Sequence, residues 1–377
     1  MKIAILTAGI WPIDIGGIQK HSFCLAKYLS QNEVFVDVYT FMKNEDIDIT
    51  KFFTNDELKY ISFINVPFPK FPKFPGHYIL ASWVFSKRIT IKVLQNNQYD
   101  IIYAQGFTSL YFFLLGKNKN IVTNLHGLNM FQYSPNLRTR VESMALMIPA
   151  KCIIKNSKYQ ISLGGKLTNI LTKLSNNNNS IFEISNGIER NWICNNQRST
   201  INNTRKFVFI GRYDKIKGIN EINKVLNKIN KDFEFHFIGP IPDQEKIVNK
   251  NIKYHGLITD ANKIKLILNS SDFLVCPSYS EGMPTAVIEA MACRCAIIAT
   301  DVGAVSVLVD YSNGWLIAPK NINELFNVFN YAISISNEDL EIMKHNSFEK
   351  VKEKFTWDKI AKEHILYFEK IINQNKI

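Results

Sequence analysis

Two glutamates in the second half of the chain, Glu281 and Glu289, have a spacing that could do chemistry on a hydroxyl-rich ligand. An apolar run at residues 273–277 precedes them, and a second apolar run at 296–299 follows. This order predicts a strand, a loop, a helix and another strand, with Glu281 in the loop and Glu289 inside the helix. A carboxylate in each position can accept hydrogen bonds from the hydroxyl groups of a bound molecule.

The helix expected between the two glutamates has a start that suits an anion. Pro284 fits its first turn, where the N–H that proline lacks would have no partner anyway. From Thr285 to Glu289 is about one turn, roughly 6 Å at ~1.5 Å per residue. Because free N–H groups at a helix start bind anions, the layout suits a nucleotide sugar, with phosphate on the helix start and one sugar against each glutamate. Two solvated carboxylates are the competing interpretation.

A loop with two basic residues could supply the matching phosphate clamp. It covers residues 211–218, directly after the apolar run 207–210, and contains Arg212 and Lys217. Each charge-assisted hydrogen bond to a diphosphate would contribute about 1.5–3 kcal/mol. Two cations can offset the charge that develops on a diphosphate leaving group without a metal ion. The alternative is an exposed loop with ordinary surface cations.

Further candidates lie in the first half. Gly16 and Gly17 fall between an apolar run at 3–6 and a helical pattern, and glycines let backbone N–H groups approach a phosphate closely. His126 follows the apolar run 121–125, where it could donate to a substrate hydroxyl; a purely structural histidine is the alternative. The chain has no Gly-x-Gly-x-x-Gly motif, which argues against a dinucleotide-binding fingerprint.

The elements that must position these residues form an α/β pattern that occurs twice. The strands expected in the first half lie at 3–6, 34–39, 101–104, 121–125, 152–155 and 181–184. Those expected after a restart near residue 204 lie at 207–210, 233–238, 273–277 and 296–300. Alternation with helices predicts parallel, doubly wound sheets. We therefore expect two Rossmann-like domains, 1–187 and 188–355, that face each other across a cleft, and a final helix over 356–377.

Composition indicates a folded, two-domain protein with a basic first half. The chain has 377 residues, of which 46% are hydrophobic and 21% charged, and a formal net charge of +12. Residues 1–187 carry 20 Lys and Arg against 11 Asp and Glu, and the remainder carries 25 against 22. This excess favours an anionic partner such as a membrane surface or a lipid phosphate, with a solvated Lys-rich surface as the alternative. No run of basic residues is interleaved with aromatics, so we expect no nucleic-acid partner.

Cysteine usage and hydropathy indicate a cytoplasmic protein. The six cysteines show no Cys-x-x-Cys spacing, which favours reduced thiols over disulfides or a zinc site. The short apolar N-terminus is predicted to be a first strand rather than a signal peptide. No apolar run approaches ~18 residues, so any membrane contact would be peripheral, at the inner face. The segment 68–75, rich in Pro, Phe and Lys, suits an interfacial loop or a plain crossover.

In combination, these motifs resemble the retaining glycosyltransferases of family 4, which have the GT-B fold. The likeness extends over nearly the whole chain. The motifs that carry it are Gly16-Gly17, His126-Gly127, Ser185-Asn186-Gly187, Gly211-Arg212, Lys217-Gly218, Gly256, Pro277-Ser278, the stretch from Glu281 to Ala290, and Phe355-Thr356-Trp357. The resemblance implies two Rossmann-like domains and a last helix that crosses back onto the first domain.

The resemblance also implies how a nucleoside-diphosphate sugar donor would be held by the second domain. Glu289 would hold the ribose hydroxyls. Glu281, with the backbone N–H groups of Gly282 and Met283, would hold the donor sugar, and the base would lie near Gly256.

The remaining implied roles concern the phosphates and the reaction. Arg212 and Lys217 would bind the diphosphate, Gly17 would bring an N–H to the distal phosphate, with Gly16 beside it, and His126 would touch the donor sugar. The implied transfer keeps the anomeric configuration, needs neither metal nor cofactor, and places a glycan or lipid-linked acceptor on the first domain. The expected role is synthesis of a surface polysaccharide or glycolipid.

Two departures and three alternatives remain. Many relatives carry histidine where this chain has Gln105, and the loop at Gly239-Pro240 has no second glycine nearby. A nucleotide-sugar epimerase or phosphorylase of the same architecture would share these motifs, and so would a non-catalytic binding subunit. A nicotinamide dehydrogenase would need the missing glycine fingerprint. The residues do not specify the sugar, the base, the acceptor or the oligomeric state.

Overall fold

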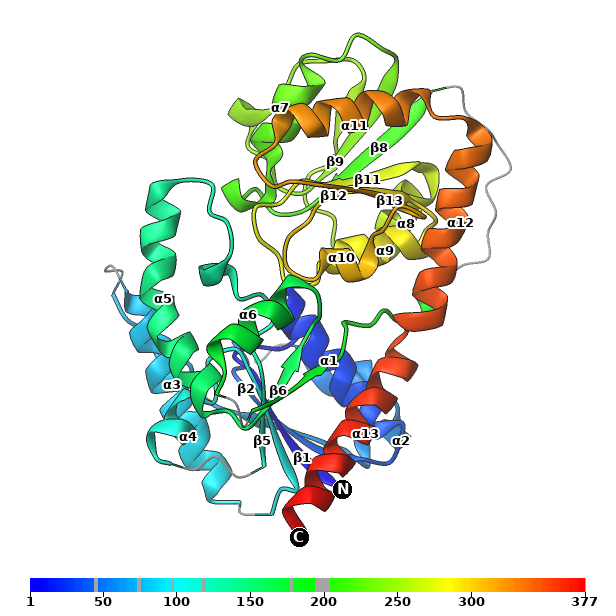
Figure 1. Cartoon of the computed structure of the whole chain (residues 1–377). Coiled ribbons are helices and arrows are strands. Elements are labelled where there is room, and N and C mark those ends of the chain that lie inside the picture. Colours follow the sequence, from blue (N-terminus) through cyan, green and yellow to red (C-terminus); the bar gives the residue numbers. More distant parts are fainter. Residues whose placement is uncertain are drawn as a thin grey trace. The chain divides into compact units, whose positions relative to one another are not determined.

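The computed structural model describes residues 1–43, 47–72, 76–96, 98–116, 120–176, 179–193 and 204–376. Within these residues the chain forms two compact units (Figure 1). Unit 1 comprises residues 1–131, 138–187 and 357–377, and unit 2 comprises 132–137 and 188–356. Cys194, nearly all of the Asn- and Ser-rich stretch 195–204, and three residues of the 68–75 segment lie outside the described residues.

Unit 1 contains a parallel sheet in the order β3-β2-β1-β4-β5-β6-β7. Its strands are β1 (Lys2–Leu6), β2 (Phe35–Thr40), β3 (Ile61–Asn65), β4 (Ile101–Gln105), β5 (Ile121–Asn124), β6 (Tyr159–Ser162) and β7 (Ser180–Glu183). Its helices are α1 (Gly17–Ser30), α2 (Asn55–Leu58), α3 (His77–Leu94), α4 (Leu110–Leu114), α5 (Leu137–Asn156), α6 (Lys166–Leu174) and α13 (Trp357–Lys376). Short 3-10 turns are η1 (Ile49–Phe52) and η2 (Asn129–Phe131).

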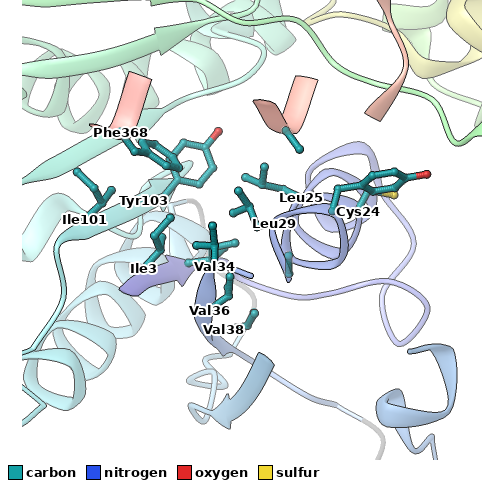
Figure 2. Close-up of a cluster of buried hydrophobic side chains, with 14 of the residues drawn as sticks. Ile3, Cys24, Leu25, Leu29, Val34, Val36, Val38, Ile101, Tyr103 and Phe368 are labelled. Carbon is teal, nitrogen blue, oxygen red and sulfur yellow. The ribbon is translucent and has the colours of Figure 1, made fainter. Parts of the chain in front are cut away.

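The sheet of unit 1 is covered on both faces, as its apolar strands require. Helices α1 and α13 pack on one face, and the side chains of α3 and α4 join the core on the other. Figure 2 shows the first core, with Leu25 and Leu29 of α1 above the strand residues Ile3 and Val36. Phe368 of α13 lies against Tyr103 of β4, with 5.9 Å between the ring centroids. The last helix is therefore part of the core of unit 1.

Unit 2 repeats the architecture with a parallel sheet in the order β10-β9-β8-β11-β12-β13. Its strands are β8 (Arg205–Ile210), β9 (Phe233–Ile238), β10 (Ile252–Tyr254), β11 (Phe273–Cys276), β12 (Ala296–Thr300) and β13 (Gly314–Ile317). Its helices are α7 (Ile219–Leu226), α8 (Ala261–Ser270), α9 (Thr285–Ala292), α10 (Val305–Leu308), α11 (Ile322–Ser334) and α12 (Asn337–Lys354). Short 3-10 turns are η3 (Arg190–Trp192), η4 (Lys215–Lys217) and η5 (Asp243–Glu245).

Aromatic side chains fill the core of unit 2 between the sheet and α11. The ring of Phe329 on α11 lies 4.0 Å from that of Phe207 on β8, centroid to centroid, and stacks on it. Phe207 also stacks on Phe273 of the neighbouring strand β11. In Figure 1, α7 and α11 cover one face of this sheet and α8, α9 and α10 cover the other. The two doubly wound parallel sheets expected from the sequence are confirmed.

One expected strand is wrong. Residues 152–155 form the end of α5, and the strand that follows is β6. A short apolar run cannot be distinguished from a buried helix segment by its period alone. Here Ala150, Ile153 and Ile154, at helical spacing, are the buried residues of α5. The strands β3, β6, β10 and β13 were not expected from the pattern; each has only three to five residues.

Candidate functional site

The loop that follows β11 brings two predicted site residues together. Nζ of Lys217 donates to Oε1 of Glu281 at 2.6 Å, and the Ser278 hydroxyl donates to the same oxygen at 2.7 Å. Glu281 is buried, with 8% of its surface exposed. The two motifs meet because β8 and β11 are neighbours in the sheet, so the loops after both strands leave the same edge. Ser278 is an additional contact of Glu281.

The charges of this cluster support one another. Burial alone would lower the pKa of Lys217, but the carboxylate of Glu281 outweighs it, so the pKa of Lys217 is raised and the ammonium stays charged. Arg212 is exposed, and its positive charge is close enough to act on Lys217 in the opposite direction. Burial raises the pKa of the nearby Cys276 thiol to about 11, so this cysteine is a neutral neighbour.

Backbone contacts hold the Glu281 loop in place. The N–H of Tyr279 donates to the carbonyl of Ile216 at 2.8 Å, and the N–H of Ala304 donates to the carbonyl of Gly282, also at 2.8 Å. Gly303 has a φ of 57°, and a Cβ built on it would lie 2.2 Å from the carbonyl oxygen of Glu281. Only glycine allows both this conformation and this approach. No motif in the sequence pointed to Gly303.

The loop with the two cations is packed equally closely. Gly218 has a φ of 73°, and a Cβ there would lie 2.2 Å from the carbonyl oxygen of Pro277. Lys217 therefore precedes a glycine that lets its loop lie directly on the Glu281 loop. The Asp214 carboxylate accepts from the N–H of Ile216 at 2.9 Å and caps the η4 turn that carries Lys217.

A residue distant in sequence also binds the Glu281 loop. The side-chain amide of Gln132 donates to the carbonyl of Glu281 at 2.7 Å and accepts from its N–H at 3.4 Å. The short segment 132–137 therefore belongs to unit 2, although the residues on both sides of it belong to unit 1. Nothing in the local sequence pattern signals this contact, because it joins positions 149 residues apart.

The helix start predicted after Glu281 is present. Pro284 is the N-cap of α9 and Thr285 its first residue, and among the described residues no side chain caps this end. Met283, just before it, is 4% exposed. Glu289 is partly buried one turn further along the same helix. The uncapped N–H groups of this first turn are therefore suited to an anion.

Three glycines lie at the carboxyl ends of neighbouring strands. The N–H of Gly239 after β9 donates to the carbonyl of Gly256 after β10 at 2.8 Å. A Cβ on Gly239 would lie 1.9 Å from the carbonyl oxygen of Gly211, so only glycine fits there. Gly256 has a φ of 68° and open space around its Cα. The loop at Gly239-Pro240 departs from the family pattern, but it keeps Gly239, the glycine that the close approach to Gly211 requires.

In unit 1, His126 is held in a strained conformation by polar side chains. Its φ is 59°, in the left-handed region that is uncommon for histidine. The backbone N–H of His126 donates to the Asn124 side chain at 2.8 Å, and its Nε2 lies 2.9 Å from Oε1 of Gln105. Gln105, at the position where many relatives have histidine, is thus a direct hydrogen-bond partner of His126. A ring hydrogen-bonded at Nε2 is fixed in orientation and in tautomer.

His126 is one of three buried histidines in contact. Its ring lies 4.9 Å from that of His21, centroid to centroid, and His21 lies 6.0 Å from His364 of α13. Burial lowers the pKa of His126 to about 3 and that of His364 to about 4, and burial takes the pKa of His21 well below its usual range. All three are therefore neutral near pH 7. Asn186 bonds to Nδ1 of His21 at 3.0 Å, so the predicted turn at 185–187 also contributes to this cluster.

Gly16 and Gly17 lie at the start of α1. Gly16 has an extended backbone, with a φ of 176°, so its conformation does not require glycine. A Cβ on Gly17 would meet no heavy atom within 4 Å, so the space beside it is open.

Neither a metal-ligand cluster nor a membrane-spanning helix occurs among the described residues. No group of three or more His, Cys, Asp or Glu side chains in that part of the chain is clustered as metal ligands are. Its helices include none with the length and hydropathy needed to cross a bilayer.

Comparison with known proteins identifies similar chains over the full length. Two family models match, one described as Glycosyltransferase Family 4 at residues 15–190 and one described as Glycosyl transferases group 1 at residues 204–334. The uncharacterized glycosyltransferase MJ1069 of Methanocaldococcus jannaschii is 26% identical, covering 98% of this chain and 98% of its own length.

Solved structures agree in fold. Sucrose-phosphate synthase from Thermosynechococcus elongatus matches with a TM-score of 0.81 at 18% identity, over 99% of both chains. HepE of Anabaena, in complex with UDP and glucose, matches with a TM-score of 0.68 at 15% identity, over 98% of this chain and 100% of its own. These matches confirm the predicted GT-B fold class.

Proposed function

The chain belongs to the glycosyltransferases of family 4, and we propose that it moves a sugar from a nucleoside-diphosphate sugar to a glycan or lipid-linked acceptor with retention of the anomeric configuration. The observation that carries this proposal is the contact of Lys217 and Ser278 with one carboxylate oxygen of Glu281. This cluster lies at the carboxyl edge of a parallel sheet, where α/β proteins bind nucleotides.

Donor binding would exchange the partners of this ion pair. A diphosphate offers Lys217 a stronger anionic partner than one carboxylate does, and Arg212 is the second cation of the same loop. Glu281, released from Lys217, would then accept hydrogen bonds from the hydroxyls of the donor sugar. The two cations would offset the charge that develops on the departing diphosphate.

The other predicted residues have roles in the same proposal. Glu289, one turn into α9, would accept from the ribose hydroxyls, and the open space beside Gly256 would admit the base. In unit 1, Nε2 of neutral His126 is engaged with Gln105, so Nδ1 would accept a hydrogen bond from a hydroxyl of the donor sugar. Gly17 would donate its N–H to the distal phosphate. We propose no metal in this chemistry, because the two cations supply the positive charge.

The proposed class of acceptor follows from the net charge of the first half of the chain. The net charge of the first 187 residues is strongly positive, which suits an acceptor with phosphate groups and contact with an anionic membrane at the inner face. A phosphate-bearing lipid-linked glycan in surface polysaccharide or glycolipid synthesis meets both requirements. Because the fold resembles that of a sucrose-phosphate synthase, a soluble sugar phosphate is the second acceptor to test beside the lipid-linked glycan.

Donor specificity can be tested without knowing the acceptor. Thermal shifts would be measured with nucleoside diphosphates and their sugars, beginning with UDP and UDP-glucose because HepE is solved with UDP and glucose. We expect Glu289→Gln to weaken nucleotide and nucleotide sugar alike, by roughly tenfold. Glu281→Gln should abolish the gain in affinity that the sugar adds and lower turnover at least ~100-fold. Glu338→Gln, at an exposed position on α12, is the matched control.

Three results would contradict the proposal. Full transfer activity in Glu281→Gln would remove the assigned role of the loop. Rapid formation of an epimer from the nucleotide sugar without any acceptor would instead favour the epimerase alternative. Binding without turnover over a wide acceptor panel would favour a non-catalytic subunit.

A further inference from the structure

The first half of α5 has an apolar surface where a water-facing helix is normally polar. None of the residues from 138 to 149 is buried, whereas Ala150, Ile153 and Ile154 near the other end are. The exposed fractions are 59% for Val141, 54% for Met144 and 76% for Ile148. Large apolar side chains therefore point away from the protein over about two turns.

Helical geometry gathers these three side chains into one stripe. They are spaced i, i+3 and i+7, which places them on one face of an α-helix. Ala150 and Ile154, which are buried, fall on the opposite side at ~100° per residue. The helix is thus apolar both toward the protein and away from it. We call Val141, Met144 and Ile148 the α5 stripe.

Cations border the α5 stripe. At ~100° per residue, Arg138 lies along one edge, and Arg140 and Lys151 lie along the other. Arg140 and Lys151 are exposed. Arg138 is paired with Glu142 at 3.0 Å, and Glu142 is the one acidic residue of α5 against four basic ones.

The neighbouring helix α3 supports the protruding turns. The Tyr78 hydroxyl at the start of α3 donates to the carbonyl of Glu142 at 3.1 Å. Along its length, α3 adds Lys87, Arg88 and Lys92 and no acidic residue. The turn of α5 between Val141 and Met144 is therefore tied to the start of a second basic helix.

We propose that the α5 stripe docks on the surface of an anionic lipid bilayer. Apolar side chains flanked by Arg and Lys are the combination that lets a helix lie in the interface, with the side chains among the acyl chains and the cations at anionic headgroups. The charge is complementary to such a surface, and a purely apolar partner would leave these cations without a role. This inference rests on the membrane contact in the proposed function and assigns it to a surface.

The test measures binding of the full-length chain to vesicles without donor or acceptor. Vesicles of phosphatidylcholine with phosphatidylglycerol are compared with phosphatidylcholine alone. We expect Val141→Gln/Met144→Gln/Ile148→Gln to reduce partitioning to the anionic vesicles at least roughly tenfold. Arg140→Gln and Lys151→Gln should each reduce it roughly fivefold, and added salt should weaken wild-type binding.

A matched control replaces three apolar helix residues elsewhere that are equally exposed. Leu266→Gln/Ile342→Gln/Leu366→Gln removes side chains that are 70%, 54% and 66% exposed, and vesicle binding should stay at the wild-type level. Unchanged circular dichroism and melting would show that both triple variants are folded.

Four outcomes overturn the inference. The stripe variant could bind the anionic vesicles as wild type does, the control variant could lose binding equally, or wild type could prefer neutral vesicles. A concentration-dependent dimer in buffer that the stripe variant abolishes would also overturn it, in favour of a second copy. Donor binding is measured separately. A variant that loses vesicle binding but still binds the donor tests only the role of α5. Failure of the wild-type chain to bind the donor would contradict the proposed function and would leave the membrane inference to the vesicle data.

Discussion

At the scale of single residues, the ion pair between Lys217 and Glu281 combines a structural with a proposed functional role. Glu281 is buried and its carboxylate oxygen has both Lys217 and Ser278 as partners. Removing one member of a buried pair leaves the other uncompensated, whereas removing both charges does not. Loss of activity in a single variant therefore has two explanations, the lost functional group or the unpaired buried charge. A double-mutant cycle, in which the two residues are substituted singly and together, separates them.

We predict that stability and activity separate in that cycle. Lys217→Met should lower the free energy of unfolding by about 1.5–3 kcal/mol, because Glu281 loses a charged hydrogen-bond partner. Lys217→Met/Glu281→Gln should regain most of that stability and still show no transfer. Urea unfolding and an acceptor-dependent transfer assay provide the two readouts. Equal stability of the single and double variants would show that the pair is not coupled in folding.

At the scale of elements, α13 shows how a helix at the end of the chain completes the first unit. Its residues Trp357, Ile360 and Phe368 are part of the core built by β1, β4 and α1. Gly187 lies against this helix so closely that a Cβ would be 2.8 Å from the Trp357 ring. The sequence predicted the helix from its apolar spacing, and its contacts with α1 follow from the fold.

Two residues of α13 provide a matched prediction. Phe368 is fully buried and Leu366 is 66% exposed. Phe368→Ala should cost about 3–5 kcal/mol of unfolding free energy through lost transfer energy and a cavity. Leu366→Ala should stay within about 0.5 kcal/mol of wild type. Denaturant titration measures both, and similar costs for the two would contradict the packing of α13 described above.

At the scale of the whole molecule, the basic charge is concentrated in the first half of the chain, whereas a buried histidine cluster joins both ends of the sequence. The basic excess is concentrated in the first 187 residues. The same part contributes His21 and His126 to a buried neutral cluster that His364, from the last helix, completes. Around it lie Tyr103, whose hydroxyl is 3.3 Å from Nε2 of His21, and Asn186. Histidines from both ends of the sequence thus lie in one buried cluster.

This cluster predicts loss of stability in acid. The histidines of the unfolded chain take up protons near pH 6.5, whereas the folded ones do so only near pH 3 to 4 for His126 and His364. The unfolded state therefore binds more protons below pH 6.5, and stability falls as the pH drops. Each histidine contributes up to about 1.4 kcal/mol per pH unit.

A single variant tests the origin of the effect. Nε2 of His364 has no hydrogen-bond partner among the described residues, so leucine can replace the ring without leaving a side-chain partner unpaired there. Between pH 7 and pH 5, His364→Leu should lose about 2 kcal/mol less stability than wild type. Urea unfolding at the two pH values measures the difference. Parallel pH profiles would show that His364 does not contribute.

The residue pattern was enough to predict the fold class, the family and most of the strands that carry the site. Apolar periodicity is a local property, so β1, β8, β9, β11 and β12 could be placed from their own residues. The motif residues Glu281 and Lys217 were identified in the same way, from residue types that follow a strand. The roles in donor binding and transfer stay predictions for all the site residues: Glu281, Lys217, Arg212, Glu289, Gly256, His126 and Gly17.

The residues that support those motifs became apparent only from contacts between segments distant in sequence. Gln132 and Gly303 contact the backbone of Glu281 from other segments, and Gln105 and Asn124 hold His126. Such contacts depend on strand order and on loop packing, which local spacing does not encode. The exposure of the α5 stripe has the same origin, because an apolar residue on a helix shows whether it is buried only once its neighbours are in place.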